Sequence, residues 1–237
     1  MDVARLSAAA LTAVVLVTAC TVTTDPQEVP APAEPSTSST APAPTVTGTV
    51  DRAAMKSDEQ AAVSAVDAFW RRYFADQPGQ PQYRGPRVAG AYVGTNGPPC
   101  GGEPESVPFN AVYCRPGDFV AWDDNLMAAG YQQIGDAWIY LIIAHEWGHA
   151  IQARLSADRV SVAAELQADC LAGAALQGAA DDGLIEIEPG DSEEIARTLA
   201  AVADDYPWTD VSDHGNAEQR TAAFNAGVEG GVPACLT

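Results

Sequence analysis

Two histidines and a glutamate, close together in the chain, have the types and spacing for metal chemistry. His145 and His149 stand four residues apart, and Glu146 follows the first of them. On a helix, residues four apart lie on the same face, so both imidazoles can bind one metal ion while Glu146 points beside it. The chain holds only three histidines, and two of them belong to this pattern. We therefore expect a Zn²⁺ site in which Glu146 takes the proton of a metal-activated water.

A helix is needed to position this pattern, and the neighbouring residues predict one. Gly135 and Asp136 mark its start, with Asp136 as the N-cap residue. A stripe at helical spacing follows, formed by Trp138, Leu141, Ile142, His145, His149 and Gln152. A five-letter pattern with two free positions also arises by chance on buried helices, and the stripe argues against that alternative.

The composition fits one catalytic domain with additional segments. The chain has 237 residues, of which 47% are hydrophobic, and this is enough to bury a core. Its formal net charge is -20, from 12 basic and 32 acidic residues. This balance argues against a nucleic-acid partner, because such proteins carry a basic footprint, and against charge-driven binding to anionic membranes.

The N-terminal part of the chain predicts export and tethering. Residues 1–19 combine Arg5 with an apolar run too short to span a bilayer, which is typical of a signal peptide. The run ends in Val-Thr-Ala before Cys20, and this ending resembles the lipobox of bacterial lipoproteins, in which the cysteine is acylated. Residues 20–54 are rich in Pro, Ser and Thr and predict a tether to a domain over 55–237. The alternative is an ordinary cleaved signal peptide with an incidental cysteine.

Helices and short strands are predicted along the rest of the chain. Ser57 and Gln60 have the spacing of a capping box that opens a helix. Two strand-like runs, 111–114 and 119–122, flank a Pro-Gly-Asp turn. Either run is a candidate edge strand for pairing with an extended peptide, and a structural hairpin is the alternative. Further helices are expected over residues 160–177, 191–205 and 216–225.

The helix expected over 160–177 carries two acidic residues on one face. Glu165 and Asp169 are four residues apart, so their side chains are neighbours on a helix. Like charges at this spacing repel each other, but the pair makes sense if one carboxylate binds a cation. The alternative is an ordinary acidic face exposed to solvent.

These motifs, taken in chain order, resemble one bacterial protein family. They are His-Glu-Trp-Gly-His at 145–149, Glu-Leu-Gln-Ala-Asp-Cys at 165–170, His214-Gly215 followed by Gln219-Arg220, and the pair Cys100 and Cys114. They lie between roughly residue 95 and residue 237 and resemble the bacterial neutral zinc metallopeptidase family. The resemblance implies a zincin-like α+β fold, mostly helical with a small β element, and a zinc-dependent peptidase activity.

The resemblance also implies a set of metal ligands of the gluzincin type. It makes Glu165 the third zinc ligand beside His145 and His149, and Asp169 a carboxylate behind the ligands. The residue types agree with this assignment. A catalytic zinc needs three protein ligands and one open position, and Asp169 can accept a hydrogen bond from a histidine N–H.

The third histidine leaves several roles open. His214 is the rival third ligand, or a catalytic donor to the tetrahedral oxyanion, or a residue that makes a cap or loop hydrogen bond. We favour Glu165 as the ligand. A metzincin-type site is excluded because Gln152 and Leu155 stand where that class needs a glycine and a histidine.

Four cysteines remain after Cys20, and an even number in an exported protein indicates disulfides. Three pairings are open, and we favour Cys100 with Cys114 and Cys170 with Cys235. Zinc binding by thiolates is the weaker interpretation, because no two of these cysteines form a C-x-x-C motif.

The sequence thus predicts an extracytoplasmic zinc peptidase, anchored to the membrane through a lipid on Cys20, whose partners are peptides or proteins. Glu146 accepts a proton from the attacking water and later gives it to the leaving amine. The rival from another class is a non-catalytic envelope protein that uses zinc as an interaction module. Glu146 argues against it, because a structural site needs no general base. A metal-binding solute receptor is weaker still. The negative charge favours neutral or basic substrates, although a solvated acidic surface explains that charge equally well.

Overall fold

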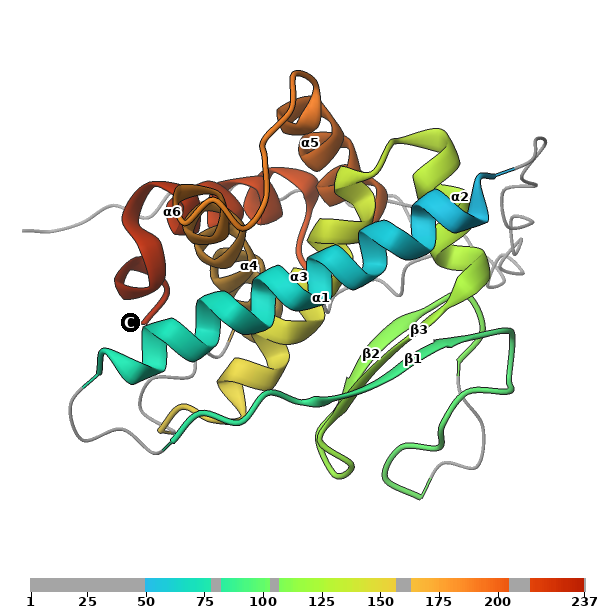
Figure 1. Cartoon of the computed structure of the whole chain (residues 1–237), viewed down its shortest axis with the longest axis horizontal. Coiled ribbons are helices and arrows are strands. Elements are labelled where there is room, and N and C mark those ends of the chain that lie inside the picture. The colour runs from blue at the N-terminus through green and yellow to red at the C-terminus, as the bar shows by residue number, and fades with distance from the viewer. Residues whose placement is uncertain (1–49, 78–81, 103–106, 157–162, 205–213, 237) are drawn as a thin grey trace, which may run out of the picture. The chain divides into compact units, whose positions relative to one another are not determined.

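A computed structural model describes residues 50–77, 82–102, 107–156, 163–204 and 214–236. Within these ranges the chain forms six helices and one three-stranded sheet (Figure 1), which confirms the mostly helical α+β class. The elements in chain order are α1 (Arg52–Ala75), β1 (Arg87–Tyr92), β2 (Ala111–Cys114), β3 (Phe119–Asp123), α2 (Asp124–Gln133), α3 (Ala137–Gln152), α4 (Ala164–Asp181), α5 (Asp191–Ala201) and α6 (Ala217–Cys235).

The expected signal peptide over 1–19, its acylated Cys20 and most of the tether lie outside the described residues. Within the described residues, α1 starts earlier in the chain than expected. It begins at Arg52, so the prediction of a capping box at Ser57 was wrong. The Asp51 carboxylate accepts hydrogen bonds from the backbone N–H groups of Ala53 and Ala54 and so caps the helix earlier in the chain.

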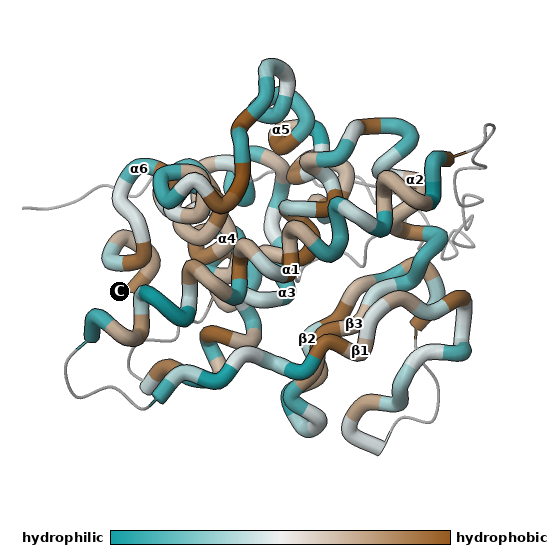
Figure 2. Tube along the Cα trace, viewed as in Figure 1, coloured by the Kyte–Doolittle hydropathy of each residue, from teal (hydrophilic) through white to brown (hydrophobic). Residues whose placement is uncertain are grey.

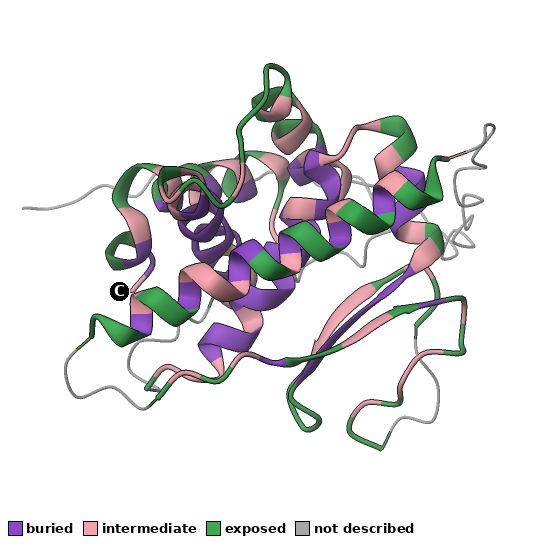
Figure 3. Cartoon of the chain, in the orientation of Figure 1, coloured by how far each residue is buried: buried purple, intermediate pink, exposed green. Residues whose placement is uncertain are grey.

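The sheet has the strand order β1, β3, β2. Strand β1 runs parallel to β3, with a shift in register between Val88 and Gly90. Strand β2 runs antiparallel to β3, so the two predicted strand runs form a hairpin. All five residues of β3 are buried, whereas β2 is a half-buried edge strand (Figure 3). Figure 2 shows hydrophobic residues on the strands of the sheet. Among the described strands, none pairs with the outer edge of β2.

Helix α3 lies at the centre of the core, and all but two of its residues are buried. It packs against α1, α4, α2, α5 and the sheet. Asp136 stands at the N-cap position as expected, but its side chain makes no capping hydrogen bond. Instead, the Glu194 carboxylate of α5 accepts a hydrogen bond of 3.2 Å from the backbone N–H of Ala137. A residue distant in the chain thus caps the helix that carries the histidines.

The ends of the last three helices differ from the sequence-based expectation. Helix α4 continues to Asp181, and α5 ends at Ala201. Helix α6 continues past Gly227 to Cys235, with a kink at Gly231. Gly227 does not end the helix, because it is the point where α6 contacts α4. A Cβ atom at this position would lie 1.9 Å from the carbonyl oxygen of Cys170.

Two disulfides tie these elements together, and both have the pairing that we favoured. Cys100 is bonded to Cys114 at the end of β2, and Cys170 of α4 is bonded to Cys235 of α6. Among the described helices, none combines the length and the apolar character needed to cross a membrane.

Candidate metal centre

Three side chains from two helices converge on one point. His145 and His149 come from α3, and Glu165 comes from the first turn of α4. The Nε2 atom of His145 lies 3.2 Å from Glu165 Oε2, and the Nε2 atom of His149 lies 3.3 Å from Glu165 Oε1. One ligand atom from each of the three residues lies within 4.8 Å of the others. These are the three residues that the sequence predicted as metal ligands.

The hydrogen bonds behind the histidines leave the right nitrogens free for a metal. His145 Nδ1 lies 2.8 Å from Asp169 Oδ1, and His149 Nδ1 lies 3.0 Å from Gln152 Oε1. Both partners are acceptors, so in its neutral form each ring carries its proton on Nδ1 and leaves the lone pair of Nε2 facing Glu165. Two neutral imidazoles and one carboxylate form a donor set that suits Zn²⁺. The residues present therefore fit a zinc ion.

Asp169 joins the first histidine to an arginine on α6. Its carboxylate is fully buried and accepts hydrogen bonds of 2.8 Å from Nε and from Nη2 of Arg220. Arg220 Nη1 also donates to the carbonyl oxygen of Val202. Burial raises the pKa of Asp169, but His145 and Arg220 outweigh it and hold the pKa below its usual range. The sequence singled out Arg220 only as part of a motif, and the structure assigns it this contact.

Gln152 supports the second histidine, a role that its place in the predicted helical stripe does not reveal. Its Nε2 atom donates to the carbonyl oxygen of Ala164 at 2.6 Å and to Gln167 Oε1 at 3.2 Å. Gln167 in turn donates to the carbonyl oxygen of Cys235 at 2.8 Å. These amides connect His149 to α4 and to the end of α6. In the sequence, the signal for this role was that Gln152 stands three residues after His149, but its partners on α4 are set by the fold.

The charges of the three converging groups show that the site favours a cation. Burial lowers the pKa of His145, but Asp169 and the hydrogen bonds outweigh burial and raise it to about 10. Burial opposes the charged form of His149 too, yet the hydrogen bond to Glu165 raises its pKa. Burial raises the pKa of Glu165, but both histidines outweigh burial and hold it far below its ordinary range. Without a metal, protons on the imidazoles of His145 and His149 supply the positive charge that faces the Glu165 carboxylate.

A glycine inside the histidine motif lets the two helices approach closely. A Cβ atom on Gly148 would lie 2.7 Å from the carbonyl oxygen of Ala168 and 2.9 Å from its Cα atom. Both contacts are to backbone atoms, which cannot rotate away. Because Ala168 lies between Glu165 and Asp169 on α4, this close approach sets the distance from both carboxylates to the histidines.

A cleft of about 1200 Å³ opens over the converging side chains. Its walls come from α2, α3, α5 and the edge strand β2. Glu146 lines the cleft beside the three ligands but does not belong to the converging set. The structure therefore places the expected general base in the same cleft as the expected metal ligands.

His214 lines the same cleft and is held by Asp204. Asp204 accepts hydrogen bonds from the backbone N–H groups of His214 at 3.1 Å and Gly215 at 2.8 Å. The His214 ring contributes its Nδ1 atom, 3.4 Å from Asp204 Oδ1. Burial raises the pKa of Asp204, but these backbone N–H groups and His214 outweigh it and lower the pKa. The converging set of ligands does not include His214, and Asp204 was not singled out from the sequence.

The arrangement is a candidate metal site of two histidines and one glutamate on a mostly helical α+β domain. The family model for the group described as "Putative neutral zinc metallopeptidase" matches residues 3–237, and the chain belongs to this family. The resemblance inferred from the motifs is therefore confirmed.

Bacterial proteins similar to this chain extend beyond the region they share with it. Uncharacterized protein YpfJ of Escherichia coli strain K12 is 32% identical over 117 residues, which cover 39% of this chain and 40% of that protein. Uncharacterized proteins Mb2605 of Mycobacterium bovis and Rv2575 of Mycobacterium tuberculosis are each 29% identical over 207 residues, covering 72% of this chain. The chain spans 66% of the length of these mycobacterial relatives. No solved structure matches the chain.

Proposed function

We propose that this chain is a zinc-dependent peptidase that hydrolyses peptide bonds while tethered by a lipid on Cys20 at the outer face of the cytoplasmic membrane. One observation carries the catalytic part of the proposal. The Nε2 atoms of His145 and His149 converge with Glu165, and Glu146 lines the same cleft outside this set. Three ligands with a separate general base are what a hydrolytic zinc site requires, whereas a structural site has four ligands and no base.

The side chains of the cleft take distinct roles in this reaction. A bound zinc ion supplies Lewis acidity, which acidifies water and polarises a carbonyl group. Glu146 accepts the proton of the attacking water on its carboxylate and later gives it to the leaving amine. His214, whose backbone N–H donates to Asp204, donates a hydrogen bond from its ring to the oxyanion that develops on the substrate carbonyl.

The edge of β2 offers backbone groups that suit an extended peptide. Asn110 O accepts a hydrogen bond from Asp123 N, so these two residues form a hydrogen-bonded pair of the antiparallel ladder. Hydrogen-bonded and non-hydrogen-bonded pairs alternate, so the N–H and C=O groups of Ala111 and Tyr113 point away from β3. Both residues line the cleft. A substrate strand can therefore pair with β2 across the metal centre.

Two observations support the extracytoplasmic location. Small residues precede Cys20 after an apolar run, as in the lipoprotein signal. The fold also contains two disulfides, which form and persist in oxidising compartments. Replacing Cys20 by serine should abolish incorporation of radiolabelled palmitate and release the protein from the membrane fraction. Retention of label in that variant would contradict the lipid anchor.

The catalytic proposal is tested by zinc content and by cleavage of casein, an unstructured protein. We expect one zinc per chain in the wild type and in Glu146→Gln, with cleavage by the wild type alone. Glu165→Gln is the matched control, because it changes a neighbouring glutamate in the same way but should lose the metal. Zinc in both chains without any cleavage would instead favour the non-catalytic interaction module. Absence of zinc from the wild type would contradict the metal site itself.

A further inference from the structure

The charges that line the cleft differ from those of the rest of the chain. The sequence has 32 acidic residues against 12 basic ones, yet among the described residues the acidic side chains that line the cleft are the ligand Glu165 and the general base Glu146. Arg220 also reaches the cleft, but it is committed to Asp169. The remaining charged side chains of the lining are Arg115 and Arg197.

These two arginines lack the partners that most arginines of this domain have. Five described arginines form ion pairs with a carboxylate: Arg52, Arg71, Arg72, Arg154 and Arg220. Within the described residues, Arg115 and Arg197 lie in no such pair. Arg197 donates to a carbonyl oxygen, that of Gln133, and both side chains are exposed. Among the described residues, neither guanidinium group has a carboxylate within ion-pair distance, although Glu194, three residues before Arg197 on α5, attracts Arg197.

Arg115 lies at the end of the cleft where α3 stops. It directly follows β2, in the turn that leads to β3. In the same turn, Asp118 forms an ion pair with Arg154, which comes two residues after the last residue of α3. The turn between β2 and β3 is thereby fixed beside the C-terminal end of α3.

Arg197 lies at the opposite end, where α3 begins. It bonds to the carbonyl oxygen of the last residue of α2, and its neighbour on α5, Glu194, caps the first residue of α3. The 16 residues of α3 span about 24 Å. An extended peptide of about seven residues covers that distance. A peptide that lies along α3 in the cleft would therefore have Arg197 toward one end and Arg115 toward the other, with His145 and His149 between them.

We propose that the cleft selects peptide segments that carry acidic side chains on both sides of the bond to be cleaved, with Arg115 and Arg197 as the residues that determine this preference. The inference rests on the proposed function and names its substrate class. A preference for acidic substrates is the opposite of what the net negative charge of the chain alone predicts, which is a preference for neutral or basic ones. The Debye length is about 10 Å at 0.1 M salt, so distant acidic residues are screened while an arginine in contact with the substrate is not.

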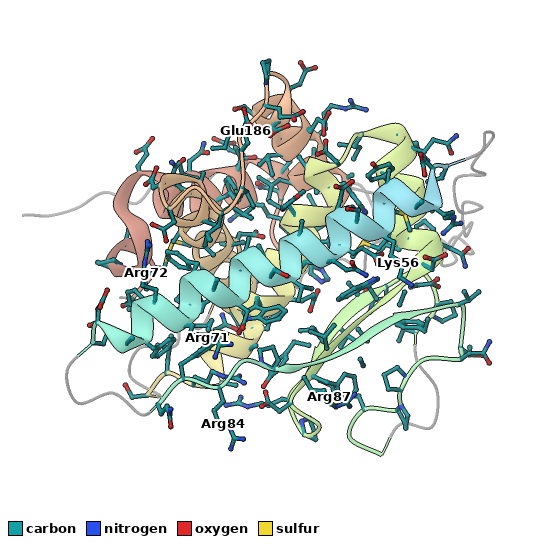
Figure 4. All side chains as sticks on the ribbon, in the orientation of Figure 1. Lys56, Arg71, Arg72, Arg84, Arg87 and Glu186 are labelled. Carbon is teal, nitrogen blue, oxygen red and sulfur yellow. A yellow bond between two sulfur atoms is a disulfide. The ribbon has the colours of Figure 1, made fainter. Side chains whose placement is uncertain are left out.

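The test uses peptides of ten residues with one central sequence and Glu, Gln or Lys placed three residues before or after the centre. Binding to zinc-loaded Glu146→Gln is measured by fluorescence anisotropy, and cleavage by the zinc-loaded wild type is measured as kcat/KM. Each variant is made in both backgrounds: Arg115→Glu, Arg197→Glu, and the control Arg84→Glu. Arg84 is an exposed arginine on the segment before β1 and is not part of the cleft lining, so the control makes the same change in net charge (Figure 4).

We expect the unaltered cleft to prefer Glu over Gln by about two- to fivefold at each flank, the range of an exposed ion pair, and to disfavour Lys. Arg115→Glu should invert the preference at one flank, Arg197→Glu should invert it at the other, and Arg84→Glu should change neither. Equal binding of the three peptides, or an equal effect of Arg84→Glu, would overturn the inference. Charge-dependent binding without cleavage would support the inference and contradict the peptidase. Cleavage without charge preference would support the peptidase and contradict the inference.

Discussion

The contact between α3 and α4 at Gly148 makes a demanding prediction about zinc affinity. In Gly148→Ala the new Cβ atom would lie 2.7 Å from the carbonyl oxygen of Ala168. An ordinary van der Waals contact of this kind begins at 3.4 Å. The shortfall, 3.4 minus 2.7, is 0.7 Å, and the nearest atoms on α4 are backbone atoms of Ala168. The two helices must therefore move apart by about half an ångström or more.

The magnitude follows from what the two helices carry. The displacement moves Glu165 and Asp169 away from His145 and His149 by more than the roughly 0.2 Å tolerance of a metal-ligand distance. We expect zinc affinity to fall by about 10- to 100-fold, the range seen when groups supporting the ligands are disturbed. Overpacking should lower the free energy of unfolding by about 1–3 kcal/mol. The better helix propensity of alanine offsets up to about 1 kcal/mol of that loss.

The assay is competition for zinc with a chromophoric chelator, beside urea unfolding of the metal-free protein. Gly173→Ala is the comparator, because its Cβ atom would lie 2.2 Å from the carbonyl oxygen of Phe224 on α6, at the other face of α4. This variant should lose stability as well, with a smaller loss of zinc affinity. Wild-type zinc affinity in Gly148→Ala would refute the reasoning, and so would equal losses of affinity in both variants.

Three further predictions concern protons, the edge strand and a disulfide. Because His145 has a pKa of about 10 without metal, its protonation stabilises the metal-free fold fully below pH 6.5 and less as pH rises toward 10. Zinc must displace that proton, so the affinity of the site for zinc should increase by up to about tenfold per pH unit between pH 6.5 and 10. A zinc affinity that does not change with pH in chelator competition would contradict this prediction. Ala111→Pro removes an N–H group that points away from β3, so it should reduce kcat/KM while zinc stays bound. Val112→Pro breaks the ladder to β3, so it should destabilise the fold, as thermal unfolding would show. Reducing Cys170–Cys235, which closes a 65-residue loop, should lower the free energy of unfolding by about 4 kcal/mol in urea titrations, and a negligible change would contradict it.

The sequence identified the parts of the site that depend on local spacing. His145 and His149 are one turn apart on any helix, and Glu165 and Asp169 are one turn apart on another, so each pair was visible as a pattern. The order of the motifs along the chain resembles that of one protein family, and this resemblance predicted that the two helices contribute ligands to one metal site. The strand runs at 111–114 and 119–122 were also visible, because a turn signal lies between them.

What the sequence did not reveal depends on contacts between distant segments. Gln152 supports His149, and Asp204 holds His214, but neither residue type indicates its partner. Gly227 has the appearance of a helix end, and only the packing of α6 on α4 shows that it serves close approach. Likewise Glu194 caps α3 from 57 residues away. Capping and support of this kind are tertiary contacts, which local propensity cannot express.

The reach of α6 into the metal centre has a consequence for the order in which the molecule matures. Arg220 lies 75 residues after His145 in the chain, and Cys235 supplies both the disulfide to α4 and the carbonyl group that holds Gln167. A polypeptide that emerges from its N-terminal side presents the three ligands before the segment that orients them exists in folded form. With zinc bound as proposed, we therefore expect high-affinity uptake of the metal only after α6 has docked. The time at which zinc becomes bound during refolding would therefore report when α6 docks.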